Sequence, residues 1–253
     1  MSAAGRAVVV VPGRLASDRL PRKLLLAESG RPLYAHVLER CRGARRADAV
    51  IAAVDGDELA AAAAGTGAQV VRTPPDLASG TDRVWAAVRD DPTVRLVVDV
   101  QGDEPEIEPE AVDAVFAALE DGAAAVTLAA PLPPERAGDP DCVKVVCDLA
   151  GRALYFSRAA VPHPRRPGGV APRLHVGVYG FQREVLERFA SWPPTPLERT
   201  EGLEQLRLLE HGVALTVLDW PRAFPGIDTR RDYDAFLERV GRAAPAPPPP
   251  PSP

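Results

Sequence analysis

The chain has 253 residues, of which 46% are hydrophobic and 26% are charged, as is ordinary for a globular protein. This length allows one large α/β domain or two smaller ones, with ample material for a hydrophobic core. The net charge of −5 argues against general binding of nucleic acid, so an anionic ligand has to be bound by a local basic patch.

The sequence also indicates a cellular compartment. Its 3 cysteines are odd in number and show no zinc-binding spacing, which fits reduced thiols in a cytosol. The valine run 8–11 is too short for a signal peptide, and Pro12 follows it directly. No apolar segment approaches the roughly 20 residues that span a bilayer. We therefore expect a cytoplasmic protein that binds neither membranes nor nucleic acid.

Apolar strands and helices alternate along the first half of the chain. The expected strands are 7–11, 49–54, 69–71, 97–100 and 124–128. The expected helices are 32–41, 57–64, one that follows the loop 76–83 and runs to about residue 88, and about 109–119. Repeated βα units of this kind predict an α/β fold with a doubly wound, mainly parallel sheet.

The pattern changes near residue 140. Two short apolar segments, 142–147 and 153–156, predict an inserted β-hairpin. A loop rich in proline and arginine follows, and the later elements are a strand over 174–181, helices over 183–190 and 196–210, a strand over 215–218, and a last helix capped by Asp228 or Thr229. We expect one domain over 1–240, with a hairpin region at about 140–215, and a disordered proline-rich tail over 241–253.

Acidic and amide side chains follow the strand 97–100. Gln101, Asp103 and Glu104 come directly after its last valine. Ligands of a parallel sheet lie beyond the carboxyl ends of its strands, so Asp103 stands where such a protein holds a metal or a phosphate. Grouped carboxylates suit Mg²⁺. A polar turn that leads into the next helix would explain the same residues equally well.

The loop 13–23 carries four cations, Arg14, Arg19, Arg22 and Lys23, against the single acidic residue Asp18. It follows the first strand, at the position where α/β proteins bind phosphate through backbone N–H groups and basic side chains. The spacing of a P-loop is absent. We favour phosphate binding over a merely solvated loop, because position and charge agree.

Two other segments carry candidate binding residues. In the loop 76–83, Ser79 or Thr81 is suited to cap a helix, and Gly80 lets the backbone approach a flat ligand closely. In the strand 174–181, His175 and Tyr179 share one face because side chains alternate along a strand. For His175, a structural role and a role in binding are both open.

Seven motifs occur between residues 7 and 240 in the order of one enzyme family. They are Arg14-x-x-Ser17-x-Arg19-Leu20-Pro21-x-Lys23, Ser79-Gly80-Thr81-Asp82-Arg83, Val100-Gln101-Gly102-Asp103-Glu104-Pro105, Leu154-Tyr155-Phe156-Ser157-Arg158, His175-x-Gly177-x-Tyr179-Gly180, Leu203-Glu204-Gln205-Leu206-Arg207 and Gly226-Ile227-Asp228-Thr229. The chain thereby resembles the CMP-Kdo synthetases, which are 3-deoxy-manno-octulosonate (Kdo) cytidylyltransferases.

The resemblance implies a fold of the nucleotidyltransferase type, CTP and an acidic acceptor as substrates, Mg²⁺ as cofactor and a homodimer. Carried over by motif, the triphosphate is held by Arg14 and Lys23. The metal ligands are Asp103 and Asp228. Next to the nucleotide lie Ser79, Gly80, Arg83 and Gln101. The sugar-acid pocket is lined by Arg158, His175, Tyr179, Glu204 and Gln205.

These roles agree with the chemistry of cytidylyl transfer. An acceptor oxygen displaces pyrophosphate at the α-phosphorus, and the protein supplies positioning and charge neutralisation rather than a covalent intermediate. That reaction needs carboxylates for a metal, a basic loop for phosphates and a cationic pocket for an acidic acceptor. The sequence contains candidates for all three.

The chain departs from the family pattern at several positions. Asp18 places a negative charge in the basic loop, Arg22 stands where the family usually has Gly, Leu77 replaces a usual His, and Asp99 replaces a usual Asn. The loop 162–173 is short and contains extra cations. A compact pocket rich in positive charge suits a small phosphonate such as phosphonoformate, so this acceptor is the alternative to Kdo.

Two further alternatives remain. A nucleotidyltransferase that uses UTP or GTP would fold similarly, because the loop 76–83 favours cytosine only by resemblance. A non-catalytic, nucleotide-binding relative would be expected to have lost Arg14, Lys23, Asp103 or Asp228, and this chain keeps all of them.

Overall fold

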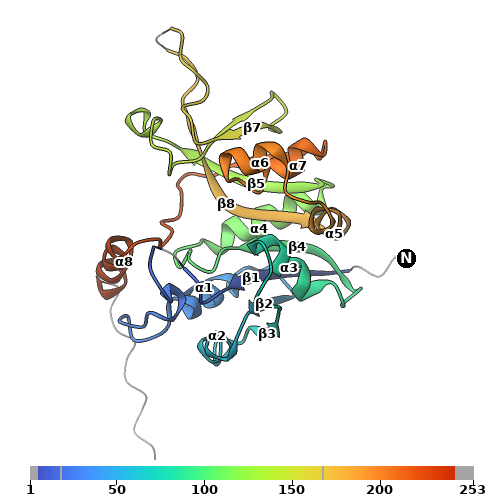
Figure 1. Cartoon of the computed structure of the whole chain (residues 1–253), viewed down its shortest axis with the longest axis vertical. Helices are drawn as coiled ribbons and strands as arrows, with labels where there is room; N and C mark the ends of the chain where they lie inside the picture. Colours follow the sequence, from blue (N-terminus) through green and yellow to red (C-terminus); the bar gives the residue numbers. More distant parts are fainter. Residues whose placement is uncertain (1–4, 18, 167, 243–253) are drawn as a thin grey trace, which may run out of the picture.

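The computed structural model describes residues 5–17, 19–166 and 168–242, and these form an α/β fold around one large sheet (Figure 1). Asp18 and most of the predicted proline-rich tail lie outside the described residues. The last helix reaches Arg242, past the expected domain boundary at residue 240. None of the described helices has the length and apolar character of a membrane-spanning segment.

The elements largely follow the expected order. The strands are β1 (Arg6–Gly13), β2 (Ala49–Val54), β3 (Gln69–Arg72), β4 (Val94–Val100), β5 (Ala125–Pro131), β6 (Lys144–Cys147), β7 (Ala153–Ser157), β8 (Arg173–Gln182) and β9 (Leu215–Asp219). The helices are η1 (Lys23–Leu25), α1 (Leu33–Cys41), α2 (Asp57–Ala62), α3 (Gly80–Val88), α4 (Pro109–Glu120), η2 (Pro134–Arg136), α5 (Arg183–Ser191), α6 (Pro196–Glu201), α7 (Leu206–Glu210) and α8 (Arg230–Arg242).

The strand order within the described residues is β3-β2-β1-β4-β8-β5-β9. The pairs β1–β2, β2–β3, β1–β4 and β5–β9 are parallel, whereas β8 runs antiparallel between β4 and β5. The predicted hairpin of β6 and β7 is present, and it joins the sheet through a pairing of Lys144 with Leu174. The doubly wound, mainly parallel sheet and its inserted hairpin are therefore confirmed.

The antiparallel strand β8 brings the two halves of the chain together. Asp99 pairs with Tyr179 and Val100 with Val178, so the second half of β8 lies beside β4 and its first half extends past the carboxyl end of β4. The polar loop after β4 thus emerges next to His175 and Gly177. Sequence alone did not predict this contact, because strand order in a sheet depends on long-range pairing.

Both faces of the sheet are covered by helices. Val9 and Val11 of β1 pack into a core with α1, α2, α4 and α8, and Val8 and Val10 pack into a second core with α3, α5 and α7. All four valines are fully buried. This burial on both faces explains why β1 is continuously apolar rather than alternating.

The expected helix 196–210 is wrong, because two short helices occupy that segment. Gly202 ends α6 in the left-handed conformation, with φ 64°, and its N–H donates to the carbonyl of Glu198 at 2.7 Å. Glycine adopts this conformation without steric cost and commonly terminates helices. Consequently Glu204 and Gln205 lie in a connection between α6 and α7, not on the face of one long helix.

Candidate active site

The loop after β1, the loop after β4 and the turn before α8 meet at one edge of the sheet. A side chain at Gly102 would place its Cβ 2.8 Å from the carbonyl oxygen of Pro12, so only glycine allows the first two loops to approach this closely. The N–H of Ile227 donates to the carbonyl of Asp103 at 2.9 Å and joins the turn to the second loop. These contacts fix the positions of Asp103 and Asp228.

A cavity of about 510 Å³ opens where these segments meet. Its charged lining comprises Arg14, Arg19, Lys23, Asp103 and Asp228. The structure thus brings together the residues that the resemblance assigned to triphosphate and metal. It adds Arg19, which the sequence had placed in the basic loop without a role.

Lys23 is the central cation of this cavity. Its Nζ lies 2.5 Å from an Asp103 oxygen and 2.9 Å from an Asp228 oxygen, and Arg19 contacts the other Asp228 oxygen at 2.8 Å. Burial acts to lower the pKa of Lys23, but the carboxylates of Asp103 and then Asp228 outweigh it, so the pKa is raised. Lys23 therefore carries its positive charge in this arrangement.

The same carboxylates suit a divalent cation. Asp103 and Asp228 converge on one point, where the ammonium group of Lys23 lies. Within the described residues no group of three or more His, Cys, Asp or Glu side chains could hold a metal ion. Two carboxylates, completed by water and by substrate phosphates, are the usual protein contribution to a Mg²⁺ site. The donor set fits Mg²⁺ rather than zinc.

A second cavity, of about 190 Å³, adjoins the first. Its lining includes the predicted nucleotide residues Ser79, Gly80, Arg83 and Gln101. Arg14, Gln101 and Pro12 line both cavities, so the two cavities lie next to each other at these residues. Leu77 also lines the second cavity.

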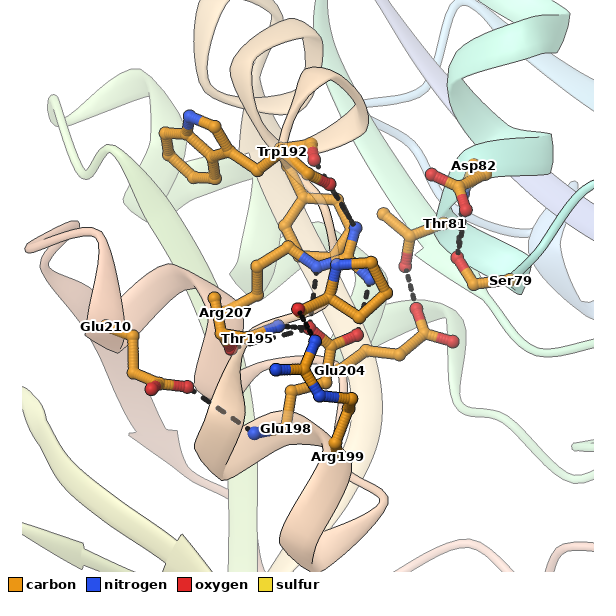
Figure 2. Close-up of polar contacts among 12 residues, drawn as sticks. Ser79, Thr81, Asp82, Trp192, Thr195, Glu198, Arg199, Glu204, Arg207 and Glu210 are labelled. Atoms are coloured by element: carbon orange, nitrogen blue, oxygen red, sulfur yellow. Dashed lines mark hydrogen bonds and ion pairs between the residues drawn. The ribbon is translucent and has the colours of Figure 1, made fainter.

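The nucleotide loop is held rigidly by its own side chains. Ser79, not Thr81, caps α3, because its hydroxyl accepts from the N–H of Asp82 at 3.1 Å. Thr81 instead donates to Glu204 at 2.9 Å, and Figure 2 shows these two side chains pointing toward each other. Arg83 is buried and donates to the carbonyl of Pro74 at 3.1 Å. The start of α3 is thereby joined to the segment after β3 and to the α6–α7 connection.

Glu204, which the resemblance assigned to the sugar-acid pocket, thus contacts the loop 76–83. It lines the second cavity, and burial raises its pKa although the hydrogen bond from Thr81 opposes that shift. Figure 2 places it beside the buried pair Arg207–Glu198, whose guanidinium Nε lies 2.8 Å from the carboxylate. Burial acts to raise the pKa of Glu198, and the hydrogen bond from Arg207 reverses that effect, so its pKa is lowered.

The face of β8 that carries His175 and Tyr179 has neutral groups, and these two residues line neither cavity. Thr127 lies 3.0 Å from Nε2 of His175, whose ring packs against Phe156 and Tyr179. Burial lowers the pKa of His175 to about 3, so this histidine is uncharged near neutral pH. Burial, followed by the charge of Glu204, raises the pKa of Tyr179. A role for His175 as a hydrogen-bonding group remains, but not as a cation.

Arg158 and Gln205 lie in different surroundings from those two residues. Arg158 donates to the carbonyls of Glu201 and Pro140 at 2.8 and 2.9 Å, and it lines neither of the two cavities. It therefore ties the hairpin to α6 in this structure. The amide nitrogen of Gln205 is buried and has no hydrogen-bond partner among the described residues, and Gln205 lines neither cavity.

Two buried carboxyl groups near the site received no role from the sequence. Glu104 lies against Gly177, and burial, with the charges of Asp103 and Asp228, raises its pKa to about 8. Asp99 accepts from the amide of Gln101 at 3.0 Å, and burial raises its pKa well above the usual range. The sequence contained a signal for both, namely acidic residues at the end of a strand that is otherwise valine.

The fold and these two cavities define a nucleotidyltransferase, and comparison with known proteins agrees. Residues 8–215 match the cytidylyltransferase family model. A solved structure of CMP:2-keto-3-deoxy-manno-octonic acid synthetase complexed with CTP superposes with a TM-score of 0.90 at 32% identity, covering 94% of this chain and 100% of that one. A cytidylyltransferase from Leptospira borgpetersenii, at 16% identity and a TM-score of 0.61, shares the fold.

Two relatives of similar length indicate which family of cytidylyltransferases includes this chain. The 3-deoxy-manno-octulosonate cytidylyltransferase of an Anaeromyxobacter strain is 48% identical over 232 residues, which cover 90% of this chain and 94% of the relative. The enzyme of the same name from Rhodopirellula baltica is 40% identical over 248 residues, covering 93% and 98%. The chain belongs to the CMP-Kdo synthetase family.

Proposed function

We propose that this protein transfers the cytidylyl group of CTP to 3-deoxy-manno-octulosonate and releases pyrophosphate. One observation carries the proposal: a cavity with three cations and two convergent carboxylates shares Arg14 and Gln101 with a second cavity, which is lined by Ser79 and Gly80 of the loop 76–83. The first suits a triphosphate with its metal, and the second suits a nucleoside. The relatives named above supply the identity of base and acceptor.

The reaction is an in-line displacement at the α-phosphorus, for which positioning and charge neutralisation matter most. Arg14, Arg19 and Lys23 would bind the phosphate oxygens. Asp103 and Asp228 would hold Mg²⁺, which supplies charge neutralisation at the phosphates when bound. Ser79 and Gly80 would form the wall against the nucleoside, close to the side chain of Gln101.

The acceptor would lie over β8 between His175 and Tyr179, next to the loop that carries Asp103. This face offers the neutral ring of His175 and the hydroxyl of Tyr179, and Glu204 lies close enough to influence the pKa of Tyr179. The unpartnered amide nitrogen of Gln205 adds a donor. Such groups suit the hydroxyls of a sugar acid, whereas a small, highly charged phosphonate would require cations at the same place.

Pyrophosphate release tests the assignment. We expect release from CTP and Mg²⁺ with 3-deoxy-manno-octulosonate, and much slower release when UTP or GTP replaces CTP. Phosphonoformate should support little or no release. Release with phosphonoformate but none with the octulosonate would overturn the proposed acceptor, and release with no acid would overturn the proposed reaction.

Three further properties belong to the proposal. The family resemblance supports a homodimer, which analytical ultracentrifugation would detect. The 3 cysteines, all free in the described structure, support a reducing compartment such as the cytoplasm. The pair Asp103–Asp228 supports a requirement for Mg²⁺, and chelation by EDTA should abolish transfer.

A further inference from the structure

Both carboxylates proposed for the metal already hold a cation from the chain itself. The ammonium group of Lys23 lies 2.5 Å from Asp103 and 2.9 Å from Asp228, and Arg19 lies 2.8 Å from Asp228. The Lys23 side chain is only 13% exposed, whereas the Arg19 side chain is 59% exposed. Lys23 is therefore the enclosed member of this group, and it stands at the point where the two carboxylates converge.

A divalent cation at the same oxygens would stand within a few ångströms of that ammonium group. Two positive charges at this separation in a partly enclosed cavity repel each other strongly, and water screens them little. Metal ion and ammonium group therefore compete for one position. The metal can bind tightly only after Lys23 has moved away.

The cavity also offers a place for Lys23 to go. Arg14, Ala16 and Ser17 line the same space of about 510 Å³, which the proposed function assigns to the triphosphate. The ammonium group ends a flexible four-carbon chain, so it can exchange partners without movement of η1. A triphosphate carries more negative charge than the two carboxylates together, so it can draw Lys23 from them.

We propose that Lys23 is an internal substitute for the metal ion, which holds Asp103 and Asp228 together until nucleotide binds and then moves to the phosphates. This inference rests on the proposed function. Nucleotide binding removes the competitor of the metal, so nucleotide and metal favour each other's binding. By thermodynamic linkage, each raises the affinity of the other by the same factor. Metal alone binds weakly to the free protein.

The first test measures Mn²⁺ binding without nucleotide by electron paramagnetic resonance. Lys23→Met keeps the length of the side chain and removes its charge, so it should bind Mn²⁺ at least tenfold more tightly than the unaltered protein. Arg22→Met is the matched control, because the neighbouring cation Arg22 pairs with Glu58 and not with either carboxylate. The control should bind Mn²⁺ as the unaltered protein does.

The second test follows the lysine itself. The sequence contains only two lysines, Lys23 and Lys144, so labelled lysine side chains give two NMR signals. Lys144 is buried and donates to the carbonyls of Asp139 and Arg158, which makes it an internal reference. CTP added in the presence of EDTA should shift the signal of Lys23 and leave that of Lys144 in place.

The outcomes separate this inference from the proposed function. Equal Mn²⁺ affinity of Lys23→Met and the unaltered protein, or a Lys23 signal unmoved by bound CTP, would overturn the inference while cytidylyl transfer still proceeds. Asp103→Asn in the Lys23→Met background should abolish the gained Mn²⁺ binding. If it does not, the metal binds elsewhere, and both the inference and the proposed metal ligands fail.

Discussion

The ion pairs of the phosphate cavity are partly exposed to solvent, whereas the ion pair between α6 and α7 is buried. In the cavity, Lys23 and Arg19 pair with Asp103 and Asp228, and the Arg19 and Asp228 side chains are 59% and 42% exposed. Between α6 and α7, the side chains of Glu198 and Arg207 form an ion pair and are only 9% and 3% exposed. The charged side chains of the cavity can exchange partners with a ligand. Arg207 and Glu198 are enclosed by the protein and cannot.

The difference follows from what each region has to do. A site for a triphosphate and its metal has to accept and release several charges during each turnover, so its ion pairs have to be open to ligand. Under the proposed function, the region around Glu204 has to hold binding groups in fixed positions. A buried, permanently paired ion pair such as Arg207–Glu198 keeps these positions fixed. The same interaction type thus serves binding in one region and rigidity in the other.

A substitution in the phosphate cavity should give the largest effect on activity. Asp103→Asn keeps the size of the side chain but removes a proposed metal ligand, and we expect kcat for pyrophosphate release to fall by a factor of about 100 or more, since metal charge stabilisation contributes several kcal/mol. The circular dichroism spectrum and the unfolding temperature should stay close to those of the unaltered protein. Asp90→Asn, at a side chain that is 87% exposed, is the control and should keep full activity.

Loss of the buried ion pair Arg207–Glu198 should lower the stability of the fold instead. Arg207→Met leaves the carboxylate of Glu198 buried without its partner, which should cost about 3–5 kcal/mol of unfolding free energy in urea. Arg199→Met on α6 is the control, since Arg199 is exposed and should contribute little. Replacing both members, with Arg207→Met and Glu198→Leu, should recover most of the loss. A double variant no more stable than Arg207→Met would contradict this account.

The uncharged state of His175 can be tested through pH. Its pKa is lowered to about 3 by burial, so the unfolded chain takes up this proton as the pH falls below 6.5 while the folded chain does not. Stability from this group is complete above pH 6.5 and is lost as the pH falls toward 3, by about 1.4 kcal/mol per pH unit. His175→Gln should therefore lose about 1.4 kcal/mol less than the unaltered protein between pH 7.5 and 5.5.

Urea unfolding at the two pH values measures this difference. His211→Gln, at an exposed histidine, is measured alongside as a control for the substitution itself. An identical loss of stability in His175→Gln and in the unaltered protein would show that His175 takes up its proton in the folded state.

The smallest expected effect on stability comes from the backbone at Arg22, the residue before Lys23. Arg22 has φ 57° and ψ 27°, a left-handed conformation that is unfavourable for residues with a side chain. We expect Arg22→Gly to be more stable than Arg22→Ala, with a folding equilibrium constant larger by roughly fivefold or more, because both lose the ion pair with Glu58 and only glycine relieves the backbone. Equal urea midpoints for the two variants would contradict the expected strain.

The spacing of apolar residues and the positions of turn-forming residues were sufficient to predict most of the fold. The valine-rich strands, the βα repeat and the hairpin around residues 148–151 were predictable, since each depends on residues close together in the chain. The break between α6 and α7 was missed because the apolar spacing of Leu203, Leu206 and Leu209 continues across it. Only the left-handed conformation at Gly202 ends the first helix.

The family motifs in the sequence also indicated which residues gather at the phosphate cavity, namely Arg14, Lys23, Asp103 and Asp228, although Asp228 lies in a turn before α8 and not at a strand end. Only the tertiary structure decided their charge states and partners. The lowered pKa of His175, the raised pKa of Glu104 and the position of Lys23 between two carboxylates depend on burial and on groups distant in the chain. Solvation and Coulomb interactions are set by distances in space, and a sequence motif does not contain them.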